Sequence, residues 1–157
     1  MTDDPARTSH PGDIDPTTVE LLIAWQSLEV ASRLVREQFA HVAGLGLTDF
    51  QALVYLSAGD GSPTKAVGDS LGLTSGAMTA LIDRIERAGY VTRVPHPLDR
   101  RSTLLYLTAS GVEAAMGAGA LYARIAETVV APADRAAVTA LFRSLAERLE
   151  AEEIAGA

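Results

Sequence analysis

The chain of 157 residues contains no cysteine, which excludes disulfides, thiolate metal sites and thiol-based redox sensing. Its three histidines, His10, His41 and His96, lie far apart without ligand spacing, so we expect no metal and no cofactor. Aromatic residues make up only 5%, which favours closely packed helices over a sheet sandwich. No apolar run approaches the roughly 18 residues of a membrane span, and the polar N-terminus is unlike a secretory signal. We therefore expect a cytoplasmic protein with no membrane partner.

The charge is unevenly distributed. The net charge is −7, but residues 62–108 carry six basic and four acidic side chains, which leaves −9 on the rest of the chain. A basic segment on an acidic body is the pattern that turns one end of a protein toward a polyanion. A random distribution of surface charge explains the same totals equally well. The sequence motifs must therefore decide whether the chain binds a polyanion.

Helical spacing of apolar residues marks both ends of the chain. The first such pattern runs from Thr17 to about Val42, a helix about 39 Å long whose apolar stripe must pack on something, such as a partner chain. A second long helix is expected from Ala109 to about Ala131, capped by Thr108. Pro132 separates it from a last helix with the same spacing.

Two glycines, Gly117 and Gly119, fall inside the second long helix. They either admit another helix at close range or leave a soft spot beside a pocket. We favour the close-packing interpretation.

Shorter helices are predicted between these two regions. Gly44–Gly46 ends the first helix, and Thr48 with Gln51 has the spacing of a capping box at the start of the next. Ser62 followed by Pro63 predicts an N-cap and a first helical residue. Gly72 can take the left-handed conformation that closes this helix.

A helix-turn-helix and a wing follow one another. Thr74 caps a helix from Ser75 to about Ala88, which completes two short helices joined by a tight turn. Tyr90–Val94 and Ser102–Leu107 then have the composition of strands. The intervening Pro95–Arg101 carries two adjacent arginines and cannot be helical. The pattern predicts a β-hairpin directly behind the second short helix.

The stretch from Leu81 to Val91 resembles the signature of the MarR family of transcription regulators. The resemblance continues through Arg93, Pro97, the Asp99–Arg101 tip, and Leu107-Thr108 with Gly111, and Leu47-Thr48 with Gln51 also looks familial. It is strongest over residues 74–111, and the helix order agrees over about 17–152.

The resemblance implies a mainly α fold with a small β-hairpin: a winged helix-turn-helix domain plus a helical dimerisation region formed by the N- and C-terminal helices. It also implies a homodimer on a pseudo-palindromic DNA operator, with two recognition helices in major grooves about one turn apart. The expected organisation is a flexible arm over residues 1–16, a dimerisation helix over 17–46, the winged domain over 47–108, dimerisation helices over 109–152 and a tail over 153–157.

Residue roles follow from this resemblance. Arg101 is expected in a minor groove, where A·T-rich DNA concentrates negative potential; the alternative is a solvated loop arginine. Asp99 is expected to brace the wing by pairing with Arg100 or Arg84. For Arg84 itself, a phosphate contact and a brace to the wing remain equally open. The expected DNA-binding residues are Lys65, Ser75, Gly76, Thr79, Arg84, Arg100 and Arg101.

The recognition helix begins with small residues, which let its axis approach the groove floor, and its free N–H groups favour a phosphate. Ser75 and Thr79 are expected to reach base edges or else to serve as caps and solvated hydroxyls. Ala80 replaces the long polar side chain of some relatives, which suggests more reliance on groove shape. Lys65, the only lysine, either holds a phosphate or lies there by coincidence.

Members of the family often respond to small aromatic or phenolic ligands held between the dimer helices and the wing domain. Such a ligand would shift the population of wing spacings. Each candidate also has a core interpretation, which we favour. The candidates are Trp25, Phe39, His41, Phe50, Tyr55, Met116 and Tyr122.

Two other functions compete with DNA binding as explanations of the sequence. An enzyme is not expected, because the chain has no phosphate loop, nucleophile elbow or metal-spaced cluster. A non-catalytic dimer that binds a ligand or a protein partner on the same fold gains some support from the acidic total. The two arginines at the wing tip argue against it and favour double-stranded DNA as the partner.

Overall fold

Helices dominate the computed structural model, which describes residues 14–98 and 102–152. The expected mainly α fold with a small β-hairpin is confirmed, with one strand more than the sequence predicts. The elements are α1 (Pro16–Val42), α2 (Leu47–Leu56), β1 (Ser62–Pro63), α3 (Thr64–Ser70), α4 (Ser75–Arg87), β2 (Val91–Pro95), β3 (Thr103–Leu107), α5 (Ala109–Val129) and α6 (Arg135–Ala151).

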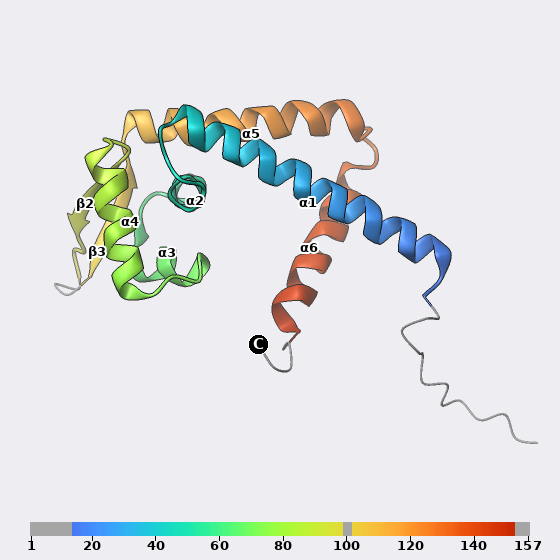
Figure 1. Cartoon of the computed structure of the whole chain (residues 1–157), viewed down its shortest axis with the longest axis horizontal. Helices are drawn as coiled ribbons and strands as arrows, with labels where there is room; N and C mark the ends of the chain where they lie inside the picture. Colours follow the sequence, from blue (N-terminus) through green and yellow to red (C-terminus); the bar gives the residue numbers. More distant parts are fainter. Residues whose placement is uncertain (1–13, 99–101, 153–157) are drawn as a thin grey trace, which may run out of the picture.

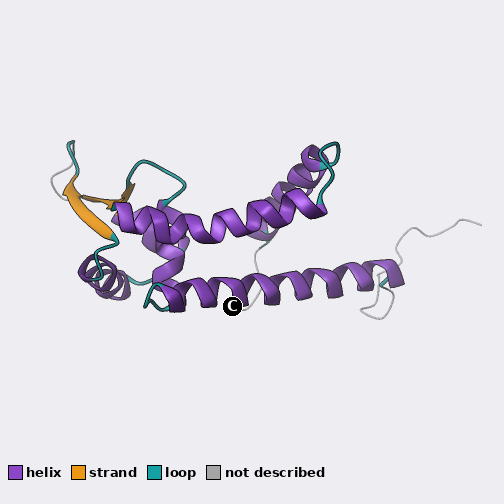
Figure 2. Ribbon diagram, turned by 90° about the horizontal axis from the view of Figure 1, so that it is seen from above, coloured by secondary structure: helices purple, strands orange, loops and turns teal. Residues whose placement is uncertain are grey.

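Two long helices form the upper layer of the molecule (Figure 1). Helices α1 and α5 extend along it, and the hairpin and α4 hang from the end where α5 begins. Helix α6 descends from the other end of α5, and the view from above shows α6 well separated from the hairpin (Figure 2). This arrangement places the winged unit at one end of a helical scaffold.

The winged unit has its own core. Leu53, Val67, Leu81, Ile85 and Leu105 are each at most 1% exposed and come from α2, α3, α4 and β3. Burying each such side chain stabilises the fold by roughly 1.5–3 kcal/mol. The sheet order is β1-β3-β2 and all pairs are antiparallel, so the hairpin is joined to the chain segment that leads into α3. The recognition helix and the wing therefore share one core.

A second, smaller cluster joins α1, α2 and α5. The rings of Phe39 and Phe50 stack with centroids 6.3 Å apart, beside the buried Ala40 and Ala118. A Cβ on Gly117 would lie 3.0 Å from the Phe39 ring, so this glycine admits α1 at close range, and it also lines a hollow beside Phe39. A Cβ on Gly119 would meet no described atom within 4 Å.

Several predicted helix ends are confirmed. The Thr74 hydroxyl accepts a hydrogen bond from the N–H of Ala77 at 3.4 Å, and the Thr108 hydroxyl accepts one from Gly111 at 3.1 Å. Gly72 has φ +63°, the left-handed conformation that closes α3. These ends depend on residues only a few positions apart, which is why the sequence reveals them.

Two predicted caps are wrong. Thr48 lies inside α2, which begins at Leu47 and whose N-cap is Gly46, which has no side chain to accept a hydrogen bond. Ser62 lies in β1 opposite Leu105 of β3, so the N-cap is Pro63 and α3 begins at Thr64, one residue later than predicted. In this second case a long-range strand pairing determines where the helix begins.

Large apolar side chains of α1 and α6 remain exposed. Leu21, Leu28, Leu141 and Phe142 are each more than half exposed, and no residue between Arg135 and Ala151 is buried. Among the described residues, no single helix has the length and hydropathy of a membrane span; α1 and α2 reach them only when joined across a 94° bend.

We expect Gly111→Ala to lower the free energy of unfolding by about 1–3 kcal/mol, since the added methyl would overpack the junction of α5 with the chain after α4. Its Cβ would lie 2.0 Å from the carbonyl oxygen of Tyr90. Urea denaturation at a fixed protein concentration measures the change. Gly119→Ala in the same helix is the control and should be neutral or stabilising by up to about 1 kcal/mol. Equal effects of the two substitutions would contradict the predicted clash.

Candidate nucleic-acid interface

The second helix of the helix-turn-helix presents its N-terminal end to solvent. The turn is closed by a hydrogen bond from the N–H of Leu73 to the carbonyl of Gly68 at 2.9 Å. Helix α4 buries Met78, Leu81, Ile82 and Ile85 on one side. The remaining positions of its first turns are exposed and small: Ser75, Gly76, Ala77, Thr79 and Ala80. An exposed helix end lined with small side chains can approach another surface closely.

Ser75 and Thr79 lie one turn apart on this exposed end. The Thr79 hydroxyl donates to the carbonyl of Ser75 at 3.0 Å, so its proton is used within the helix. Its oxygen can still accept a hydrogen bond, as a base amino group would require. A role as acceptor therefore remains open to Thr79.

Lys65 lies on α3 and pairs with Asp69 one turn later, with Nζ 2.6 Å from the carboxylate oxygen. Both side chains are largely exposed, so the pair contributes little to stability. A phosphate can compete for this ammonium group.

A hollow between α3, α4 and the start of β3 brings several predicted residues together. Lys65, Ser75 and Thr79 line it, as do Ser102 and Thr103 at the base of the hairpin. The Thr64 hydroxyl donates to the carbonyl of Thr103 at 3.2 Å and ties α3 to this base. Three of the seven predicted DNA-binding residues thus share one concave surface.

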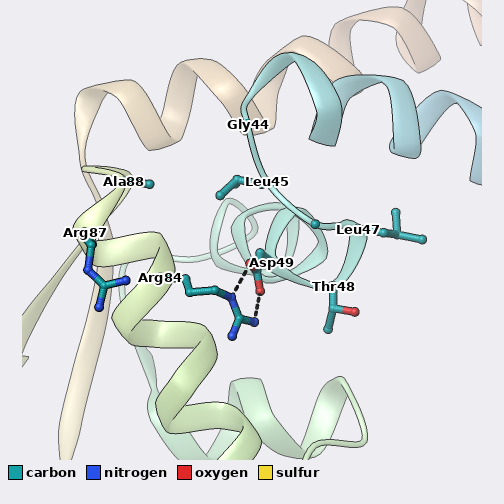
Figure 3. Close-up of a pocket in the computed structure, with 9 residues that line it drawn as sticks. Gly44, Leu45, Leu47, Thr48, Asp49, Arg84, Arg87 and Ala88 are labelled. Carbon is teal, nitrogen blue, oxygen red and sulfur yellow. Dashed lines mark hydrogen bonds and ion pairs between the residues drawn. The ribbon is translucent and has the colours of Figure 1, made fainter.

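Arg84 has a partner that the sequence did not indicate (Figure 3). Its Nε and Nη2 donate to the two carboxylate oxygens of Asp49 on α2, at 2.9 and 2.7 Å. The pKa of Arg84 is raised, first because of the hydrogen bond to Asp49 and then because of its negative charge. Neither interpretation of Arg84 from sequence included this contact, because 35 residues separate the two side chains.

Arg93 on β2 contacts two acids of the recognition helix. It forms ion pairs with Asp83 and with Glu86, the latter with Nε 2.8 Å from the carboxylate. These contacts fasten the wing strand to α4. Two acids three residues apart on a helix, followed by an arginine in the next strand, are the signal that could have indicated them.

The tip of the wing carries the strongest candidates from the sequence. Asp99, Arg100 and Arg101 lie outside the described residues. Below the tip, the N–H of His96 donates to the carbonyl of Ser102 at 3.0 Å, and Pro95 lies opposite Thr103. The hairpin that leads to the tip is therefore paired up to His96 and Ser102.

The candidate ligand residues do not share one pocket. Phe39, Phe50 and Tyr122 lie in the cluster between α1, α2 and α5, where the Tyr122 hydroxyl donates to the carbonyl of Ser32 at 3.0 Å. Trp25 lines a groove of about 690 Å³ between α1 and α6. His41, Tyr55 and Met116 are exposed at separate places. Among residues 14–98 and 102–152 there is also no group of three or more metal-ligating side chains.

Comparison with known proteins points to one family. The sequence model of the MarR family matches residues 43–102. The helix-turn-helix-type transcriptional regulator YcgE of Bacillus subtilis is 34% identical over 99 residues, 62% of this chain and 62% of YcgE. MhqR of the same organism, also a helix-turn-helix-type transcriptional regulator, is 33% identical over 46% of this chain and 50% of its own. The chain thus spans less than two thirds of either relative.

Solved structures share the fold over nearly the whole chain. RV1404 from Mycobacterium tuberculosis is 26% identical, with a TM-score of 0.63 and coverage of 92% of this chain and 99% of its own. MepR of S. aureus, in its DNA complex, gives 18% identity, a TM-score of 0.57 and coverage of 78% and 98%. NadR in complex with 4-hydroxyphenylacetate is 20% identical, with a TM-score of 0.65 and coverage of 92% of this chain and 99% of its own.

Proposed function

Because the winged helix-turn-helix of this chain belongs to the MarR family, we propose that the protein is a transcriptional repressor that binds a pseudo-palindromic operator as a homodimer. The family and the matched relatives are transcriptional regulators and not enzymes. In this proposal the protein acts in the cytoplasm on double-stranded DNA.

The observation that carries the proposal is the exposed N-terminal end of α4 beside the base of the hairpin. Ser75, Gly76 and Thr79 would enter the major groove, with Lys65 at a phosphate across the shared hollow. Arg100 and Arg101 at the wing tip would reach the backbone and the adjacent minor groove. Asp99 would pair with Arg100 and brace the tip.

A homodimer accounts for the apolar surface of the scaffold. Residues 17–46 and 109–152 would form the dimer interface, and residues 47–108 would form the DNA-binding domain. The groove between α1 and α6 is lined by Leu21, Leu28, Leu141, Phe142 and Leu149, each more than half exposed in the single chain. An apolar surface of this kind marks an interface. A symmetric partner would also supply the second recognition helix that a palindrome requires.

An effector is the third part of the proposal. A small phenolic ligand would favour a dimer in which the two wings no longer match successive grooves, and DNA would be released. NadR, whose fold this chain shares, was crystallised with 4-hydroxyphenylacetate, a phenolic acid. Trp25 lies half-buried in the α1–α6 groove and is the only tryptophan, so its fluorescence would report a change there.

We expect Arg101→Ala to weaken binding to a duplex selected from random-sequence DNA by about 1–3 kcal/mol and to lower the salt slope by about one. The loss of a minor-groove cation is the physical reason. Arg87→Ala in the last turn of α4 is the control, and its affinity should match that of the wild type. Failure of the wild type to select any duplex at low salt would leave the non-catalytic partner-binding protein as the better function.

We expect Leu141→Glu to convert the dimer into a monomer, because a carboxylate would be buried in the apolar groove without a partner. Sedimentation equilibrium measures the mass, and the same variant should lose its affinity for the selected duplex. Val94→Glu on β2 places the same charge on an exposed wing position and should remain dimeric. A wild-type protein that sediments as a monomer would contradict the proposed assembly.

We expect 4-hydroxyphenylacetate to displace the selected duplex and to change the emission of Trp25 over the same concentration range. Fluorescence anisotropy of labelled DNA and tryptophan emission measure the two effects. Cyclohexylacetate, which has the carboxylate but no aromatic ring, is the control ligand. If a panel of phenolic acids leaves the DNA affinity unchanged, the effector part of the proposal is wrong and the DNA-binding part stands.

A further inference from the structure

Asp49 is the only charged side chain that is buried in the part of the chain the structure describes. Its side chain is 7% exposed, whereas that of its partner Arg84 is 52% exposed. Both oxygens of the carboxylate receive an N–H of the same guanidinium, at 2.9 and 2.7 Å (Figure 3). A two-point contact between planar groups fixes orientation as well as distance.

The environment of Asp49 favours a carboxylate that remains paired with Arg84. Asp49 lies in the first turn of α2, where the helix dipole stabilises a negative charge and the N-cap Gly46 offers no side chain. A carboxylate removed from water becomes costly when its partner is lost. The contact therefore resists separation of α2 from α4.

The two ends of the contact lie on different helices of the winged unit. Asp49 is the third residue of α2, which follows the Gly44–Gly46 loop after α1, and Arg84 lies in the third turn of α4. Arg84 is nine residues beyond Ser75, or about 13 Å along the helix axis. A tilt of about 5° at Arg84 would therefore move the N-terminal end of α4 by about 1 Å.

We infer that the Asp49–Arg84 pair is a clamp that sets the position of the recognition helix relative to α1, and that Arg84 is a positioning residue rather than a phosphate contact. The inference rests on the proposed function, in which two copies of α4 must match successive major grooves. Within each protomer, the clamp fixes the position of α4 relative to α1. It thereby determines part of the distance between the two copies of α4 in the dimer.

The charge of the pair supports this role. A guanidinium joined to a carboxylate has no net charge, so it releases few counterions from DNA. Arg87, one turn further along α4, lines the same pocket but forms no ion pair with any described residue. Arg87 therefore provides a matched arginine that lacks the clamp.

The test uses Asp49→Asn, Arg84→Met and the double variant, with Arg87→Met as the control. Affinity is measured for the selected duplex and for a second duplex whose half-sites are one base pair further apart. We expect each single variant to lose affinity for the first duplex by on the order of tenfold. The double variant should lose no more than either single one, because one contact is removed in all three cases.

Two further readouts separate positioning from general destabilisation. The preference for the first duplex over the second should become smaller in all three clamp variants. A loss of folded protein alone would lower the affinity for both duplexes equally. The salt slope should stay at the wild-type value. Arg84→Lys, which keeps the charge but not the two-point contact, should behave like Arg84→Met.

The sign of the Asp49→Asn effect decides between the two roles of Arg84. If Arg84 binds a phosphate in competition with Asp49, the substitution frees a cation, and affinity and salt slope both rise. That outcome would overturn the clamp, as would additive losses in the double variant.

A measurement without DNA keeps this test separate from the proposed function. The chain has no cysteine, so Gln38→Cys on α1 and Ala80→Cys on α4, both exposed, can be spin-labelled uniquely. Labelled chains diluted with unlabelled ones report the distance within one protomer. We expect Asp49→Asn to shift or broaden this distribution and Arg87→Met to leave it unchanged. If neither variant changes the distribution of distances between the labels, the clamp proposal is wrong even if the wild type binds DNA.

Discussion

The junction of α1, α4, β2 and α5 depends on the contacts of one residue, Tyr90, just beyond α4. Its hydroxyl donates to the carbonyl of Ala43 at the end of α1, and its N–H donates to Ile85 inside α4. Its carbonyl accepts the N–H of Thr108 at 2.9 Å, beside Gly111 at the start of α5. One residue thereby joins both long helices, the recognition helix and the first strand of the wing. Movement of α1, α4 or α5 at that point would break one of these hydrogen bonds, and the bond from the Tyr90 hydroxyl is partly buried.

The sequence predicted the contacts between residues that are close along the chain, and it did not predict the contacts between distant residues. Helix ends closed by Thr74, Thr108 and Gly72 depend on neighbours within a few residues, and these were predicted correctly. Ser62 is also a residue type that commonly caps a helix. It lies instead in β1 opposite Leu105, so this strand pairing and not the cap determines its conformation. In the candidate site, the exposed end of α4 follows from helical periodicity, whereas the Asp49–Arg84 contact does not. From the sequence, an aspartate that pairs with a distant arginine looks the same as one that only interacts with the dipole of its own helix.

Most of the positive charge near α4 is used inside the protein. Arg84 is paired with Asp49, and Arg93 with Asp83 and Glu86, so these arginines hold α2, α4 and β2 together. The exposed end of α4 offers hydroxyls and backbone groups in place of cations. If the protein binds DNA as proposed, its electrostatic attraction would come mainly from the wing tip, and Lys65 would contribute where a phosphate displaces Asp69. The acidic remainder of the chain would then disfavour other orientations on the duplex.

Small side chains on the recognition helix have a consequence for how an operator would be distinguished. A hydroxyl at Ser75 or Thr79 discriminates bases less sharply than a two-point contact from an arginine or a glutamine. Discrimination would then depend on the shape of the groove and on the spacing of the half-sites, which a protein can read only if its own dimensions are fixed. The contacts of Tyr90, the Arg93 ion pairs and the buried carboxylate of Asp49 provide that fixed geometry within one chain. The apolar faces of α1 and α6 would provide it between two chains, so a change at either joint would alter specificity without touching a base.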